Sequence, residues 1–200
     1  MRKLVFIKSV VLTVSILLFS NISAYAAEWV IDTDSSQLNF ISIKKGTVAE
    51  THQFNKFEGQ LNSHGQFELN IDLASVDTNI EVRDDRMKKH LFDVDSFSTS
   101  SLTANIDLAL LDAIDEGRSV AVLVDTKLEL HGVTMPVQLN VIITRLVGAK
   151  LSVVSVEPVI INAADYSLVS GVNKLMEIAK LPSISHAVPV SFYLILNLKQ

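Results

Sequence analysis

Apolar and polar residues alternate along much of this chain. In residues 66–73, Phe67, Leu69, Ile71 and Leu73 are separated by polar side chains. Successive side chains of a strand point to opposite faces, so a period of two is typical of strands with one apolar face. The same pattern recurs in residues 120–130, 137–144 and 188–198, and weaker strand patterns cover residues 28–33, 36–44, 47–61, 99–109 and 149–162.

Short turns and two helical patterns connect these strands. Glycine-containing turns at residues 63–65, 131–134 and 147–149 predict hairpins, which make neighbouring strands antiparallel. Residues 79–91 and 171–179 instead place apolar side chains at helical spacing among polar ones. We therefore expect two short helical insertions in an otherwise β chain.

Eight or nine antiparallel strands must protect their edges, either by closing into a barrel or by folding into two layers. We predict an all-β, lipocalin-like antiparallel barrel of about eight strands, whose interior is filled by side chains or holds one small ligand. No linker or repeat divides the chain, so residues 27–200 are expected to form one domain. An outer-membrane barrel is disfavoured, because the few aromatic residues are not paired at strand ends.

Composition narrows the function further. The chain has 200 residues, of which 48% are hydrophobic and 20% charged, enough for a buried core. It contains no cysteine, which excludes disulfides, thiolate metal sites, cysteine nucleophiles and a lipid-modified N-terminal cysteine. Its 17 basic and 22 acidic residues give a net charge of −5, whereas nucleic-acid binding requires a basic face. We therefore expect no nucleic-acid partner.

Residues 1–26 have the layout of a secretory signal peptide. Arg2, Lys3 and Lys8 precede an apolar run over residues 10–19, and Ala24-Tyr25-Ala26 is a cleavage site of small residues. A membrane anchor is the alternative, but a spanning helix needs about 20 apolar residues. We expect cleavage after Ala26, a soluble periplasmic protein and no membrane-spanning segment.

Four segments in order resemble the YceI-like family of exported, polyisoprenoid-binding proteins. The matching residues are 28–32 with 36–40, 52–59, 74–78 with 83–84, and 128–134. Ser35 and the segment Arg83-Asp84-Asp85-Arg86-Met87 depart from the usual family pattern. The resemblance implies an elongated lipocalin-like barrel whose apolar pore takes an isoprenoid chain, with any polar head group near one mouth.

Candidate ligand-binding residues follow from the strand faces and from one cluster of charges. Side chains on the apolar faces either line a cavity or fill a core, and we predict that the lining includes Phe40, Phe54, Phe67, Leu69, Ile71, Phe92, Val122, Val124, Leu139, Val141 and Phe192. Residues 83–89 carry six charges, either as a solvated helix face or as part of a lid over the mouth. In a lid, Arg83 or Arg86 would bind a phosphate or carboxylate.

No motif in the sequence predicts catalysis or a resident cofactor. The five histidines are widely spaced, and no metal-ligand, nucleophile or phosphate-loop motif occurs. We predict a non-enzymatic carrier or sequestering protein for an isoprenoid or other long-chain lipid. The alternatives are an enzyme or redox accessory for an isoprenoid quinone, and a packed barrel that binds only a partner protein. A homodimer could form at strand edges near residues 28–33 or 149–162.

Overall fold

A computed structural model describes residues 28–199, so the proposed signal peptide lies outside the described residues. In this range the strands are β1 (Glu28–Ile31), β2 (Gln37–Lys44), β3 (Val48–Phe54), β4 (Phe57–Leu61), β5 (Gln66–Asp72), β6 (Val76–Asp77), β7 (Thr99–Asn105), β8 (Ser119–Leu130), β9 (Val133–Leu146), β10 (Lys150–Ser155), β11 (Val159–Asn162) and β12 (Ala187–Lys199). The helices are η1 (Thr33–Ser35), η2 (Leu73–Ser75), α1 (Glu81–Arg86), η3 (Met87–Phe92), α2 (Leu108–Asp112) and α3 (Val169–Ile178).

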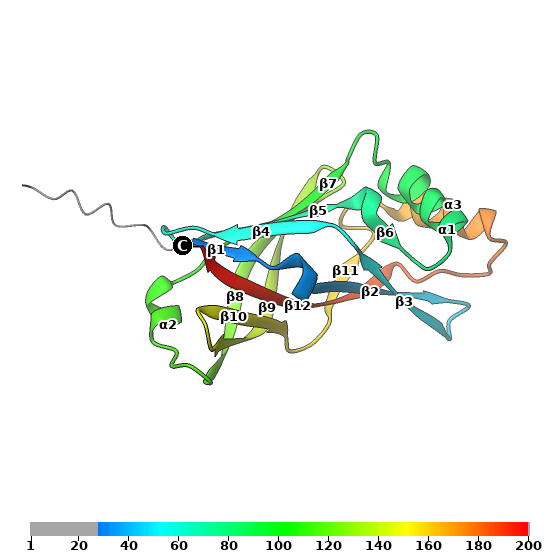
Figure 1. Ribbon diagram of the computed structural model, residues 1–200. Helices are drawn as coiled ribbons and strands as arrows, with labels where there is room; N and C mark the ends of the chain where they lie inside the picture. Colours follow the sequence, from blue (N-terminus) through cyan, green and yellow to red (C-terminus); the bar gives the residue numbers. More distant parts are fainter. Residues whose placement is uncertain (1–27, 200) are drawn as a thin grey trace, which may run out of the picture.

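Eight of these strands form a closed ring (Figure 1). Its order is β1-β4-β5-β7-β8-β9-β10-β12, and the ring closes where Trp29 of β1 pairs with Leu198 of β12. Every pairing in the ring is antiparallel. The structure thus confirms the predicted antiparallel barrel of about eight strands, and it has short helices beyond the two predicted insertions.

The long strand β12 extends the barrel wall beyond this ring. Its first half leaves β10 and pairs with β2 and β11, β2 pairs in turn with β3, and β3 pairs with β6. This extension lies at the end of the molecule where α1 and α3 pack, opposite the end that carries α2 (Figure 1). The two ends of the barrel therefore differ in construction.

The three predicted hairpins and both helical insertions are present, with three differences in detail. Segments 47–61 and 149–162 are each divided into two strands, and segment 99–109 turns from β7 into α2. The last change has a local cause. The Asp107 side chain accepts a hydrogen bond from the backbone N–H of Ala109 at 3.0 Å and so caps the helix.

Helix α2 closes the barrel end from which it projects. Its Leu111 and the following Ile114 are buried within the main core. Arg145 of β9 donates a hydrogen bond from Nη2 to the carbonyl oxygen of Leu111 at 2.6 Å, and its guanidinium lies 5.6 Å from the centre of the Trp29 ring. This cation–π contact and hydrogen bond hold the helix against β1 and β9.

Two of the three strands in the ranges proposed for a homodimer, β1 and β10, are paired on both sides within the barrel. β1 pairs with both β4 and β12, and β10 pairs with both β9 and β12. Neither strand offers unpaired backbone to a second copy, because the ring closure uses both of its sides. β1 and β10 therefore offer no edge for the possible homodimer, which stays a prediction for the remaining part of residues 149–162, strand β11. β11 pairs with β12 alone within residues 28–199.

Gly59 permits close contact between β4 and β5. A Cβ atom at this position would lie 2.6 Å from the backbone oxygen of Glu68 and 2.7 Å from Cδ1 of Ile31. Gly59→Ala should lower the free energy of unfolding by about 1–3 kcal/mol through overpacking. Chemical denaturation checks this against Glu58→Ala, an exposed neighbour on the same strand. Equal stability of the two variants would contradict the tight contact.

Candidate functional site

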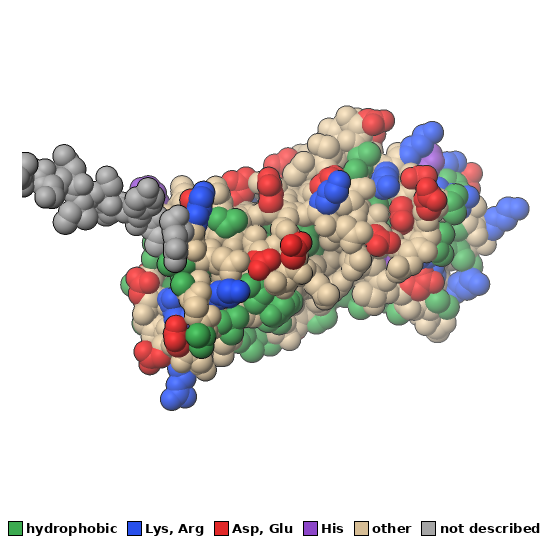
Figure 2. Space-filling view, in the orientation of Figure 1, with side chains coloured by type: hydrophobic (Ala, Val, Ile, Leu, Met, Phe, Trp, Pro, Cys, Tyr) green, Lys and Arg blue, Asp and Glu red, His purple; other side chains and the backbone are tan. Residues whose placement is uncertain are grey.

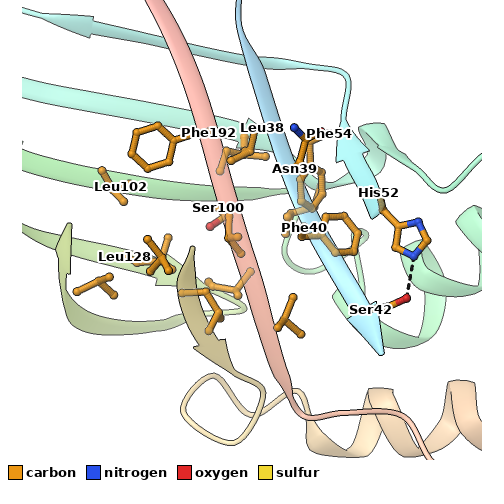
Figure 3. Close-up of a pocket in the computed structure, with 18 of the residues that line it drawn as sticks. Leu38, Asn39, Phe40, Ser42, His52, Phe54, Ser100, Leu102, Leu128 and Phe192 are labelled. Carbon is orange, nitrogen blue, oxygen red and sulfur yellow. Dashed lines mark hydrogen bonds between the residues drawn. The ribbon is translucent and has the colours of Figure 1, made fainter. Parts of the chain in front are cut away.

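A cavity of about 660 Å³ occupies the barrel interior (Figure 3). It extends from Leu61 and Leu111, near the end closed by α2, to Lys45 and Val48 in the β2–β3 hairpin. Most of its lining is aliphatic or aromatic. The interior of this barrel is therefore not filled by its own side chains.

The polar side chains in the deep part of the lining are bonded to the barrel itself. The buried Ser100 and Thr126 donate their hydroxyl protons to the carbonyl oxygens of Glu129 and Val137, both at 2.6 Å. Their hydrogen-bond donors are thus used within the wall. The deep cavity consequently presents an apolar surface to any occupant.

Twelve of the thirteen residues predicted from the sequence line this cavity. They are Phe40, Phe54, Phe67, Leu69, Ile71, Arg83, Arg86, Phe92, Val124, Leu139, Val141 and Phe192. Val122 is outside the lining and packs against the cluster that contains Leu111 and Ile114. Val122 still belongs to the interior face, so the predicted register is correct, and its cross-strand partner Val141 does line the cavity.

The exposed residues of the lining show where the cavity opens. They are Lys45, Val48, Ile80, Val82 and Ala179. These residues, called the rim below, come from the β2–β3 hairpin, the start of α1 and the end of α3. All the lysine, arginine and glutamate residues in the lining come from this hairpin and α1. The mouth therefore lies at the barrel end opposite α2.

Polarity increases along β2 and β3 toward this mouth. Their inward-facing cross-strand pairs run from Phe40 with His52, through Ser42 with Glu50, to Lys44 with Val48. Figure 3 shows the rings of Phe40 and Phe54 near His52, whose ring points to Ser42. An elongated ligand would thus meet aromatic rings deep in the cavity and charged groups at its mouth.

Glu50 joins the two sides of the mouth. Its carboxylate accepts hydrogen bonds from Lys44 Nζ on β2 and from Arg83 Nη1 on α1. The hydrogen bond from Lys44, together with Arg83, holds the pKa of Glu50 below its usual range despite partial burial. Arg83 also donates from Nη2 to the carbonyl oxygen of Thr78 at 2.6 Å. Arg83 is thus engaged in fixing the helix to the hairpin.

The helical segment at the mouth, α1 followed by η3, is anchored at its N-terminal end. Asp84 Oδ1 accepts a hydrogen bond from the backbone N–H of Thr78 at 2.9 Å and a second from its hydroxyl group. Asn79 and Asp93, on either side of the segment, have φ angles of 60° and 48°. The charges over residues 83–89 are therefore partly structural. Arg86 lines the cavity and makes no ion pair with any residue in the range 28–199.

Ser42 and His52 form a pair that sequence reasoning missed. Ser42 Oγ and His52 Nε2 are hydrogen bonded at 2.8 Å, and His52 is 3% exposed. The other ring nitrogen, Nδ1, is buried without a partner in the described part of the chain. A serine nucleophile needs a base that a third group orients, and this pair has none at Nδ1.

The range 28–199 contains no group of three or more histidine, aspartate or glutamate side chains that could hold a metal ion. No helix in it is long and apolar enough to cross a membrane.

The closed barrel, its apolar cavity and its single charged mouth define a class of ligand-binding barrel. The sequence matches the model of the YceI-like domain over residues 29–196, and the chain belongs to this family. It is similar to the solved structure of a polyisoprenoid binding domain from Saccharophagus degradans, described as implicated in plant cell wall breakdown. Identity is 37% and the TM-score 0.84, covering 86% of this chain and 98% of that one.

Two more distant structures share the fold alone. BcnA from Burkholderia cenocepacia is 18% identical with a TM-score of 0.60, covering 82% of this chain and 98% of its own. The YceI protein of Campylobacter jejuni is 11% identical with a TM-score of 0.53, covering 74% and 84%. The sequence matches no curated protein.

Burial of His52 predicts a pH dependence of stability. Burial, and then the nearby Arg83 charge, lower the pKa of His52 from its ordinary 6.5, although Glu50 opposes this. The unfolded chain therefore binds a proton more readily, and stability should fall as the pH drops below about 6.5. We expect His52→Gln to reduce this loss between about pH 7.5 and 5, measured by chemical denaturation.

The control for this measurement is His64→Gln, at an exposed position in the β4–β5 turn. It should retain the wild-type pH profile. If His52→Gln and wild type lost stability in parallel over this interval, His52 would not be the group responsible.

Proposed function

We propose that this protein is a non-enzymatic carrier or sequestering protein for an isoprenoid or similar long-chain lipid, exported to the periplasm. The observation that carries the proposal is the apolar cavity of about 660 Å³ with charged residues at one end only. Its volume is within the range of about 300–1,000 Å³ typical of ligand pockets. The relative that is 37% identical is described as a polyisoprenoid binding domain, which supports the same ligand class.

Burial of apolar surface supplies the affinity for the tail. Each buried CH₂ group contributes about 0.8 kcal/mol, so a chain of ten to twenty carbons needs no polar anchor to bind tightly. The phenyl rings of Phe40, Phe54 and Phe192 and the aliphatic strand faces provide this surface. An uncharged isoprenoid quinone has the same kind of apolar tail and belongs to the same ligand class. Binding it as cargo requires no redox chemistry from the protein.

The mouth favours a head group of negative charge. Lys44, Arg83 and Glu50 neutralise one another in part, whereas Lys45 and Arg86 line the mouth without an ion-pair partner among residues 28–199. Arg86 is thus the arginine available to a phosphate or carboxylate, and Arg83 positions the helix that carries it. This assigns different roles to the two arginines that the sequence presented as equivalent.

The unfilled interior argues against the alternative of a packed interaction module. Such a module needs its barrel interior occupied by side chains, whereas here the cavity extends from Leu61 and Leu111 to the mouth. The Ser42–His52 pair does not favour hydrolysis, because the orienting group is missing at Nδ1 in the described chain.

Filling the cavity should abolish binding of the tail. Val124→Trp places an indole in space that the tail requires, and we expect at least about a tenfold loss of affinity for every long-chain ligand, with about 1–3 kcal/mol of overpacking strain. Leu123→Trp is the matched control, because Leu123 directly precedes Val124 in β8 and is 64% exposed on the outer face. Fluorescent fatty-acid and isoprenoid titrations measure both. Equal affinities would place the tail elsewhere.

Arg86→Met tests the head-group assignment. Loss of a charge-assisted hydrogen bond should weaken an isoprenyl phosphate by about 1.5–3 kcal/mol and leave an isoprenol of equal length nearly unchanged. Arg118→Met, at an exposed site beyond α2, is the control and should alter neither ligand. Parallel titrations of the two ligands provide the measurement. Equal losses for both would mean that Arg86 supports the fold and does not bind the head group.

A further inference from the structure

The rim of the cavity exposes large apolar side chains to solvent. Val48, Ile80 and Val82 are 42%, 48% and 55% exposed, yet all three also line the cavity. Apolar surface of this kind gains free energy when it is covered. It is continuous with the interior wall, so whatever covers the rim also covers the entrance.

Basic residues gather around this apolar rim. The three segments that form the mouth, residues 44–50, 80–92 and 174–180, contain eight basic and five acidic residues, whereas the rest of the chain has nine basic and 17 acidic residues. Blue lysine and arginine side chains project at this end of the molecule in Figure 2. The mouth is therefore the positive end of an acidic protein.

We propose that the rim docks onto the surface of an anionic lipid bilayer, with the cavity mouth facing the membrane. Exposed apolar side chains beside basic ones are the combination that binds such a surface, by insertion at the head-group level and by attraction to anionic lipids. Docking in this orientation lets an acyl or isoprenyl chain move between bilayer and cavity without crossing water. The inference goes beyond the proposed function, because it concerns how the lipid enters.

The rim fits a second copy of this chain less well than it fits a bilayer. A symmetric dimer would place one mouth against the other, so the excess of basic residues on both would repel. A stable dimer also buries about 800 Å² per partner, more than three aliphatic side chains supply. An anionic bilayer attracts the basic residues of the rim, and inserting three aliphatic side chains into it needs no large apolar interface.

Vesicle co-sedimentation of the mature chain tests this docking. The probes are vesicles of phosphatidylethanolamine and phosphatidylglycerol, compared with vesicles of phosphatidylcholine alone. We expect binding to the anionic vesicles that falls with added salt. Lys45→Ser should weaken it about fivefold, the share of one basic residue near an anionic surface.

The apolar part of the rim is tested by the double variant Ile80→Ser and Val82→Ser. Ile80 is the N-cap residue of α1 and makes no side-chain capping bond, so serine there favours the helix and the variant should fold. The affinity of this double variant for anionic vesicles should be several-fold lower than that of the wild-type protein. Val147→Ser is the control, because Val147 is 77% exposed in the β9–β10 turn. This control should bind like wild type.

Docking and lipid carriage are separated by Val124→Trp, which blocks the interior and leaves the rim intact. Retained vesicle binding by this variant supports docking independently of any cargo. Absence of vesicle binding by folded wild type, or equal losses in the rim variant and Val147→Ser, would overturn the proposal. A change of sedimentation coefficient without vesicles in the rim variant would also overturn it, in favour of a second copy as the occupant.

Discussion

Closure of the sheet between β1 and β12 is the constraint on which the rest of the structure depends. Trp29 pairs with Leu198 from nearly opposite ends of the chain, and the protein has no cysteine to hold these strands covalently. Backbone hydrogen bonds and the inward-facing apolar side chains must therefore maintain the ring. Once the ring is closed, period-two alternation directs one face of every strand inward, and an interior wider than its side chains remains as a cavity.

The two ends of the barrel give this cavity a direction. At one end α2 inserts Leu111, which Arg145 holds by its carbonyl oxygen. At the other end the sheet continues through β2 and β3, whose inward face changes from aromatic to charged residues. An amphiphile therefore has one orientation in which its tail and head both meet matching surfaces. Glu50 makes this mouth a defined structure by linking the hairpin to α1.

Much of the fold, and most of the lining, could be predicted because both follow from alternation within single strands. The pairing of β1 with β12, which closes the ring, could not be predicted, since the two strands are far apart in sequence. Helix α2 was missed because its short apolar pattern continues that of β7. Ser42 and His52 share the inward phase of Phe40, so the same alternation could have found them. The exposed rim depends on how α1, α3 and the hairpin come together at the mouth, which no local pattern reports.

The intact mass of the purified protein under native conditions tests the central claim most directly. If the cavity holds a long-chain lipid, the native mass should exceed the mass expected from the sequence by that of one such molecule. The excess should disappear on denaturation, and organic extraction should recover a long-chain lipid. Protein that carries no added mass, and that also fails to bind an added isoprenoid saturably, would contradict the account.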